Sequence, residues 1–489
     1  MFGWNARHFC KVRYRWEFPA RAIHPSTKSH KTPVLCLLIA MLCALGRAAQ
    51  AQAASATPVS GFGRPLPAIA HEGPHGQDLA NFLAGHAAFK KPLSLPELGP
   101  LFNNRTCIAC HWGPAIGGSG EFMSEIRVRD DPTGGPVHLF AADNILRGGV
   151  QSQGNNSVFT TGLMSMPIGC PITSPSCIPS PCQTEEMART TFSTTLPICD
   201  PTSQSFAAGD NCSAERQSLA LFGDGLVEAV TDQTLIDLAA SEPAEVAGTI
   251  KMLNEFGRER VGRFGWKTES ATLRGFAVSA TSNELGLTTP DAPQENTSCA
   301  DGKTQFGVLL DNGQEPEDKT DASGRAEVDR MVDFIRGLAP PPRLPENARA
   351  AAGHRIFYSI GCAGCHTETL TTASDPAAFI ASTTGGVPIT KSLNRILAHR
   401  TFHPFGDYLM HDMGSLGDGI TNGSSGPTMM RTAPLWGLRV KVRFLHDGRA
   451  SDVATAIRLH DGQAKNAAQQ FEALSPAQQQ DLLDFLNTL

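Results

Sequence analysis

Two copies of one short motif constrain this chain more than any other feature. Cys107-Ile-Ala-Cys110-His111 and Cys362-Ala-Gly-Cys365-His366 each place two thiols one helical turn apart, with an imidazole directly after them. Thiols at that spacing can add across the two vinyl groups of a haem, while the histidine binds the iron. With 13 Cys and 15 His among 489 residues, chance produces about 0.01 such motifs. Zinc sites need no histidine after each pair, and a thioredoxin-like dithiol uses one motif in a βαβ unit. The sequence therefore predicts two covalently bound haem c groups.

Residues 1–53 have the pattern of a secretory signal peptide. Seven Lys/Arg and one Asp/Glu fill the first 33 residues, an apolar run follows at 34–45, and small residues continue to position 54. Cleavage is predicted after Ala51 or Ala53. The alternative is a membrane anchor, but a span needs about 20 apolar residues. We expect a periplasmic or otherwise exported bacterial protein with no membrane span after signal removal.

The charge and cysteine content of the exported part limit its partners. Removing residues 1–53 takes away eight of the 41 Lys/Arg and one of the 47 Asp/Glu, which leaves 33 against 46, a formal net charge of −13. Such an acidic protein is a poor nucleic-acid binder. We expect a small-molecule oxidant and a soluble electron donor as partners. Six cysteines remain outside the motifs and predict disulfides in 15 possible pairings, at positions 170, 177, 182, 199, 212 and 299.

A faint internal repeat predicts a mainly α fold with two similar haem domains. Phe102 and Phe357 each stand five residues before the first motif cysteine, and the stretch 332–338 resembles 483–489. We expect an N-terminal haem domain at 54–338, with a disulfide-rich insertion at about 150–215. A stiff Pro-rich linker at 339–345 and a C-terminal cytochrome c-like domain at 346–489 follow.

Local patterns predict several elements. Ser475, Pro476 and Gln478 form a helix-start signal before the last apolar stretch. The region 216–262, which includes AEVAGTIKMLNEFG, has a helical pattern, and 291–330 is polar and predicted to be a surface loop.

The sixth ligand of the second haem is predicted among residues that follow His366. Met413 is the first choice, because a thioether ligand raises the haem potential. His411 is its rival, whereas Met429 and Met430 are expected to pack around the haem.

The first haem has no comparable methionine cluster after it. His138 is a candidate distal ligand or acid–base group, and Glu121 and Glu125 are candidate distal carboxylates. Peroxide cleavage needs such a group to move a proton between the two oxygens. If no strong ligand binds opposite His111, that iron is open to substrate.

Tryptophans are candidate electron relays between two haems. The candidate relays are Trp112, Trp266 and Trp436, and Trp266 in VGRFGWK is the first choice. Buried tryptophans that only pack are the alternative.

Eight segments together resemble the bacterial di-haem oxidoreductases, which are assigned as peroxidases and also called thiol oxidoreductases. The resemblance runs from about residue 70 to the C-terminus and extends, more distantly, to bacterial di-haem cytochrome c peroxidases. The segments are GPLFNNRTCIACH, GDGLVEAV, VGRFGWK, NELGLT, GCAGCH, MHDMGSLGDG, RTAPLWGL and FLHDGRA.

This resemblance implies one haem in each of two cytochrome c-like domains. The C-terminal haem, with His366 and Met413, would receive electrons from a small cytochrome or cupredoxin. The N-terminal haem at His111 would reduce hydrogen peroxide to water. A helix over 453–459 and a calcium ion between the domains are also implied, although no compact acidic loop identifies calcium ligands.

The chain departs from the peroxidases where a distal histidine follows the first motif, because GGSG, Arg127 and Arg129 stand there. A related enzyme that matures a tryptophan-derived quinone uses a tyrosine ligand at its second haem. Tyr408 is nearby, but Met413 matches the family motif better. Two other functions stay open: an electron carrier without turnover, and a dioxygen-using oxygenase similar to enzymes that cleave rubber.

Overall fold

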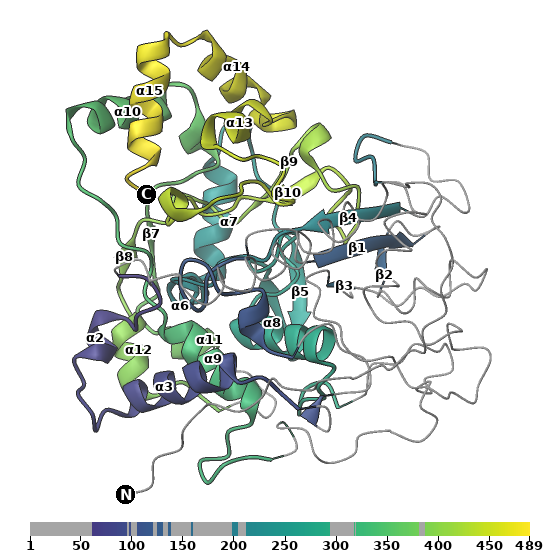
Figure 1. Ribbon diagram of the computed structural model, residues 1–489, viewed down its shortest axis with the longest axis vertical. Helices are drawn as coiled ribbons and strands as arrows, with labels where there is room; N and C mark the ends of the chain where they lie inside the picture. Colours follow the sequence, from purple (N-terminus) through teal and green to yellow (C-terminus); the bar gives the residue numbers. More distant parts are fainter. Residues whose placement is uncertain are drawn as a thin grey trace, which may run out of the picture. The chain divides into compact units, whose positions relative to one another are not determined.

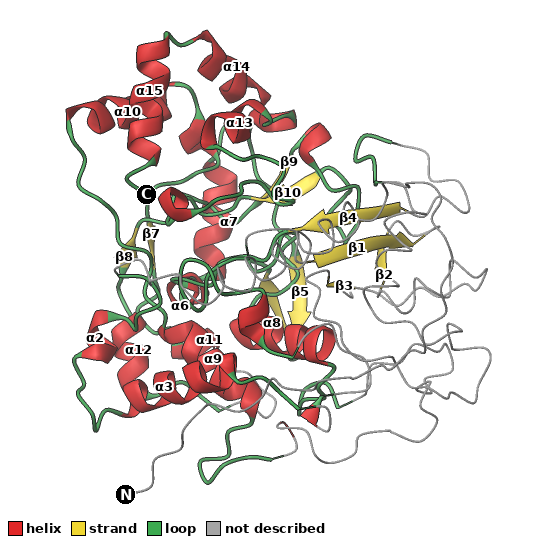
Figure 2. Ribbon diagram, viewed as in Figure 1, coloured by secondary structure: helices red, strands yellow, loops and turns green. Residues whose placement is uncertain are grey.

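Helices joined by long loops form most of the described chain in the computed structural model (Figures 1 and 2). The predicted signal peptide and most of the predicted insertion lie outside the described residues. Residues 61–94, 97–98, 105–120, 125–130, 135–137, 158–159, 198–203, 212–293, 317, 319–380 and 387–489 are described.

The first half is organised around α3 (Gln77–Lys90), which packs against α9 (Glu327–Gly337). Gly85 makes this contact possible, since a Cβ there would lie 2.1 Å from the Arg330 carbonyl oxygen. One turn later Phe89 meets Phe334, with ring centroids 5.1 Å apart. The other helices of this half are α2 (Pro67–Ala70), α6 (Asp224–Glu228), α7 (Asp232–Ser241) and α8 (Leu273–Ala280).

The second half repeats this arrangement with α10 (Ala348–Ser359) against α15 (Pro476–Leu486), side by side in Figure 1. A Cβ on Gly353 would lie 1.8 Å from the Asp481 carbonyl oxygen, and Phe357 meets Phe485 with ring centroids 5.4 Å apart. In both halves an Ala-Gly-His-x-x-Phe segment supplies the glycine and the phenylalanine. The structural counterpart of Phe357 is therefore Phe89 and not Phe102, which lies outside the described residues. The remaining helices are α11 (Ala377–Ile380), α12 (Lys391–Leu397), α13 (Val453–Arg458) and α14 (Lys465–Ala473).

Short antiparallel strands add to the helices. β1 (Glu125–Asp130) pairs with β2 (Gly135–Val137), β3 (Val158–Phe159) and β4 (Cys212–Arg216) in a sheet that the sequence did not predict. Three hairpins are β5 (Met252–Glu255) with β6 (Arg258–Val261), β7 (Leu370–Thr371) with β8 (Thr401–Phe402), and β9 (Met410–Asp412) with β10 (Met429–Arg431).

The β5–β6 hairpin corrects the helix predicted at the end of region 216–262. Phe256 and Gly257 have φ of 52° and 76°, and two successive positive φ values define the turn type that matches strand twist. The turn thus overrides the helix propensity of the Ala, Glu, Met and Leu around it. Asp224–Glu228 and Asp232–Ser241 are helical as predicted, whereas the start of the same region is not, since β4 ends at Arg216 and residues 217–221 are neither helix nor strand.

Several local predictions are confirmed. Ser475 caps α15 in a capping box with Gln478, and Pro476 is the first helical residue. The helix implied near residue 453 is α13. Residues 339–345 are neither helix nor strand, and their role as a linker stays a prediction.

More of the described chain is helix than strand, and Pro58–Leu489 forms one unit. One apolar cluster contains side chains from both halves, including Phe82 and Trp436. Cys199 and Cys212 form a disulfide, while the other four predicted disulfide cysteines lie outside the described residues. Among the described helices, none has the length and apolar character needed to cross a bilayer.

Candidate haem sites

The first C-x-x-C-H motif lies on a single 3₁₀ turn, Cys107–Ala109. The amide of His111 donates to the Cys107 carbonyl at 3.1 Å, which brings the imidazole onto the same turn as both thiols. Neither Cys107 nor Cys110 forms a disulfide. Apolar side chains gather around Cys107 from Leu93, Leu98, Leu285, Leu287 and Met331.

The orientation of His111 is fixed by a glycine-rich turn. His111 Nδ1 lies 3.0 Å from the Gly118 carbonyl oxygen. A Cβ on Gly118 would lie only 1.9 Å from the Gly113 carbonyl oxygen, so this turn requires a glycine. With Nδ1 held by a backbone carbonyl, Nε2 is the nitrogen left for a metal, as in most histidine ligands.

Three glutamates lie near the first site, and sequence reasoning had not selected them. Burial, with smaller contributions from Glu327, Glu284 and Glu317, raises the pKa of the Cys107 thiol to about 12. Glu317 is 5% exposed, and neither of its carboxylate oxygens has a hydrogen-bond partner among the described residues. Burial raises the pKa of Glu317 to about 8, and Glu327 and Asp329 add to the rise. This carboxyl group is therefore mostly protonated at neutral pH.

The second motif repeats the geometry of the first. Its 3₁₀ turn spans Cys362–Gly364, and the His366 amide donates to the Cys362 carbonyl at 3.0 Å. His366 Nδ1 lies 3.0 Å from the Phe405 carbonyl oxygen, which again leaves Nε2 available. Phe405 has φ of 54°, a costly conformation for an aromatic residue, and it directs this carbonyl toward His366. Burial, assisted by His460, lowers the pKa of His366 to about 4, so the ring is neutral as a ligand must be.

The two sites fit a covalently bound haem on their chemistry. Each places two cysteines that form no disulfide on one turn, next to a histidine whose Nδ1 is held by a backbone carbonyl. Each also borders an apolar cluster, which for the second site includes Phe357, Ile360 and Leu435.

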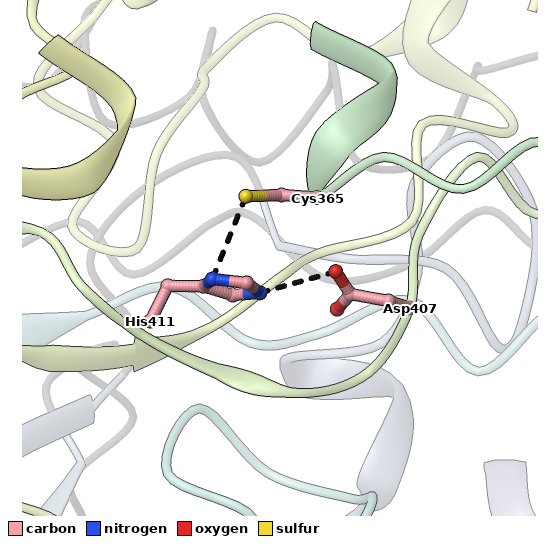
Figure 3. A group of neighbouring side chains, drawn as sticks. All are labelled: Cys365, Asp407 and His411. Atoms are coloured by element: carbon pink, nitrogen blue, oxygen red, sulfur yellow. Dashed lines mark hydrogen bonds and ion pairs between the residues drawn. The ribbon is translucent and has the colours of Figure 1, made fainter. Parts of the chain in front are cut away.

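His411, the rival ligand, is engaged at both ring nitrogens (Figure 3). Nδ1 lies 3.5 Å from Cys365 Sγ, and Nε2 lies 3.1 Å from a carboxylate oxygen of Asp407. Burial alone lowers the pKa of His411, but the hydrogen bonds with Asp407 and Cys365 outweigh it and raise the pKa to about 10. The possible ligand atoms of Cys365, Asp407 and His411 all lie within 4.8 Å of one another, a spacing that could hold a metal ion. Because Cys365 is one of the two motif thiols, this cluster belongs to the second haem site.

The candidate methionines lie on or beside the β9–β10 hairpin. Met410 and Met430 are buried within it. Met413 follows β9, is half-buried, and donates its amide to the Thr428 carbonyl at 3.0 Å. Tyr408 is buried with φ of 62°, and its hydroxyl has no hydrogen-bond partner in the described part of the chain. The identity of the sixth ligand stays a prediction.

Trp266 makes hydrogen bonds through its side chain and its backbone. Its indole Nε1 donates to the Gln217 carbonyl at 2.7 Å, and its own carbonyl accepts from the Arg431 amide at 2.9 Å. Trp112 and Trp436 line a cavity of about 100 Å³. Glu121 and His138 lie outside the described residues, and of Glu125 only the backbone, at the start of β1, is described.

Comparison with solved structures finds distant likenesses. A hydrazine synthase of Kuenenia stuttgartiensis is 17% identical, with 33% of this chain and 55% of that chain covered and a TM-score of 0.22; this chain thus spans about half of that one. A MauG-like protein associated with microbial copper homeostasis is 13% identical, with coverage of 55% and 89% and a TM-score of 0.26. A variant of the diheme peroxidase BthA from Burkholderia thailandensis is 13% identical, with coverage of 87% and 86% and a TM-score of 0.34. These three TM-scores are too low to establish a shared fold.

No curated protein matches the chain. Residues 200–489 match the family described as "Di-haem oxidoreductase, putative peroxidase". This segment contains the second motif, Trp266 and all the methionines of the β9–β10 region, and it makes up more than half of the chain. The protein belongs to the di-haem oxidoreductase family.

Proposed function

We propose that the protein is an exported di-haem c peroxidase, which reduces hydrogen peroxide with electrons that enter at its C-terminal haem. Cys107, Cys110 and His111 would hold one haem, and Cys362, Cys365 and His366 the other. When bound, the first haem supplies the centre for peroxide reduction and the second stores electrons at a higher potential. The matched helix pairs α3–α9 and α10–α15 support one cytochrome c-like domain around each motif.

The observation that carries this proposal is a continuous path between the two motifs. Ser218 Oγ donates to the Cys110 carbonyl at 2.6 Å, and the neighbouring Gln217 accepts from the Trp266 indole. Trp266 accepts in turn from Arg431, whose partner across the β9–β10 hairpin is Met410. The next residue, His411, lies 3.5 Å from Cys365 Sγ. Trp266 is the one indole on this path, which supports its assignment as the relay.

At the second site we assign Met413 as the sixth ligand. His411 is the weaker candidate, because Asp407 and Cys365 hold both of its ring nitrogens. Tyr408 is the other candidate, since its hydroxyl is buried and makes no hydrogen bond among the described residues. A Met413→Leu variant should lower the potential of the second haem, whereas an unchanged potential would point to Tyr408.

At the first site Glu317 is the group best suited to move protons. Reduction of one hydrogen peroxide consumes two electrons and two protons and yields two waters. A carboxyl with a pKa of about 8 carries a proton at neutral pH and can give it to the departing oxygen. Glu317 then takes a proton back from solvent. Glu121 and His138 stay predictions for the same role.

The donor is proposed to be a small cytochrome or cupredoxin. The formal charge of −13 without residues 1–53 supports a donor with a basic face. The Cys199–Cys212 disulfide is consistent with an oxidising compartment such as the periplasm.

Rapid mixing of the half-reduced protein with peroxide tests the path. Replacing Trp266 with Phe should slow oxidation of the second haem and steady-state turnover by roughly tenfold or more, while both haems stay attached. Trp436→Phe is the matched control, because this ring packs against Phe402 and lies off the path. Turnover of Trp266→Phe at the native rate would refute the route. Two low-spin haems that persist in the half-reduced protein, with no peroxide turnover, would refute the peroxidase assignment.

A further inference from the structure

The loop between Met413 and β10 closes around a buried ammonium group. The side chain of Lys267 is fully buried, and its Nζ lies 2.9 Å from a carboxylate oxygen of Asp418. The same Nζ donates to the carbonyls of Gly426 at 2.9 Å and Met429 at 2.8 Å. Three oxygen acceptors satisfy all three N–H bonds of an ammonium.

These oxygens are the kind that bind a hard divalent cation. Calcium takes carboxylate and backbone carbonyl oxygens from a single loop, and the loop 418–429 supplies one carboxylate and two carbonyls to one point. A lysine that reaches in from the turn after Trp266 already occupies that point.

The surrounding charges leave no room for a second cation. Arg216 binds the other oxygen of Asp418 through Nε at 2.9 Å and Nη2 at 2.5 Å, and it binds Glu269 at 2.9 Å. Lys251 Nζ donates to Asn422 Oδ1 at 2.7 Å. Three cationic side chains thus face two carboxylates in a buried region, where an added divalent ion would meet strong repulsion. Burial alone raises the pKa of Asp418, but Lys267 and Arg216 outweigh it and hold this pKa well below its usual range.

We infer that the Lys267 ammonium is the resident cation of the loop 418–429, and that the protein keeps this loop in place without calcium. The calcium ion that the family resemblance implies therefore does not fit at this position. Lys267 is a positioning residue for two neighbours. Trp266 directly precedes it, and the Thr428 carbonyl inside the loop accepts from the Met413 amide at 3.0 Å. This inference rests on contacts within the chain and does not depend on the proposed peroxidase activity.

Metal analysis of the holoprotein gives the first test. The native protein should contain no stoichiometric calcium, and neither a chelator nor millimolar calcium chloride should change its melting temperature. One tightly held calcium ion whose removal lowers the melting temperature would overturn the inference, and this result needs no variant.

Substitution of the lysine gives the second test. Lys267→Met should lower the melting temperature by roughly 5 to 10 °C, because it removes the cation paired with Asp418 and the donor to two buried carbonyls. Lys251→Met is the matched control and should cost less, because Lys251 Nζ has one close acceptor and a second at 3.3 Å.

Chemical rescue separates a cation role from simple packing. Lys267→Ala leaves the three oxygen acceptors of the loop 418–429 without a cation. Calcium chloride or methylammonium should therefore raise the melting temperature of this variant and leave that of Lys251→Ala unchanged. A Lys267→Ala protein that neither cation stabilises, or a Lys267→Met protein as stable as the native one, would refute the inference.

Discussion

Replacing Gly118 with alanine should disable the first haem site while leaving the second intact. The new Cβ would lie 1.9 Å from the Gly113 carbonyl oxygen, so the two strands of this turn must separate by about 1 Å to restore normal contact. That movement breaks two backbone hydrogen bonds between Gly113 and Ser119, of 3.1 and 2.9 Å, and the 3.0 Å bond that holds His111 Nδ1. Three hydrogen bonds at about 1 kcal/mol each give a loss of about 3 kcal/mol.

Urea denaturation measures the stability loss, and electron paramagnetic resonance of the oxidised holoprotein measures the state of the first haem. The signal of the first haem should broaden or change, because its histidine loses the bond that fixes the ring, while the signal of the second haem should not. Gly364→Ala, the corresponding change at the second motif, is the comparison, since the atoms nearest its Cβ belong to the flexible end of a side chain, that of Val246, at 3.1 Å or more. If Gly118→Ala kept native stability and a native first-haem signal, the role assigned to the turn would be wrong.

Three further changes follow from the described contacts. Replacing Cys199 and Cys212 together with serine should lower stability to urea by about 3 kcal/mol, because their disulfide closes a loop with a sequence separation of 13; a loss near zero would contradict this. Between pH 4.5 and about 8, Glu317 ionises in the unfolded native protein but stays protonated in the folded one, so the native protein loses stability as pH rises. Glu317→Gln lacks this group and should become more stable relative to the native protein over the same interval; parallel pH–stability curves would contradict this. The same variant should lose roughly a hundredfold in peroxide turnover, and native turnover would remove Glu317 from the reaction. Ser475→Ala should cost about 1 kcal/mol in the same denaturation assay, because it removes the cap of α15.

The parts of the fold that the sequence predicts are those with local causes. The C-x-x-C-H turns and the capping box at Ser475 each depend on residues within one helical turn. The segment Ala-Gly-His-x-x-Phe, which occurs before both motifs, is a further local signal of a helix contact. A glycine followed four residues later by phenylalanine places both on one helix face, and in the structure Gly85 and Gly353 lie at the close contacts of the pairs α3–α9 and α10–α15.

Other features depend on contacts between segments far apart in the sequence, so no window of residues reveals them. Asp407 was not selected because nothing near it indicates that the chain returns to Cys365. Glu317 lies in a polar stretch that reads as surface loop, yet its carboxyl is buried beside the first site. Lys267 follows a candidate relay tryptophan, and only the fold shows that the loop 418–429 surrounds it.

The two sites differ in how freely their polar groups can respond to a change of charge. At the second site His366, His411 and Asp407 all have fixed partners, and the strained backbone of Phe405 holds one of them. A site that reorganises little suits the storage and transfer of electrons, because preorganised dipoles need not move when the charge changes. At the first site Glu317 is buried, and its pKa lies near neutrality. Such a group can release and regain a proton at low cost, which a purely electron-carrying site does not need. The contrast between these polar groups is consistent with the proposal of electron storage at the C-terminal motif and peroxide chemistry at the N-terminal one.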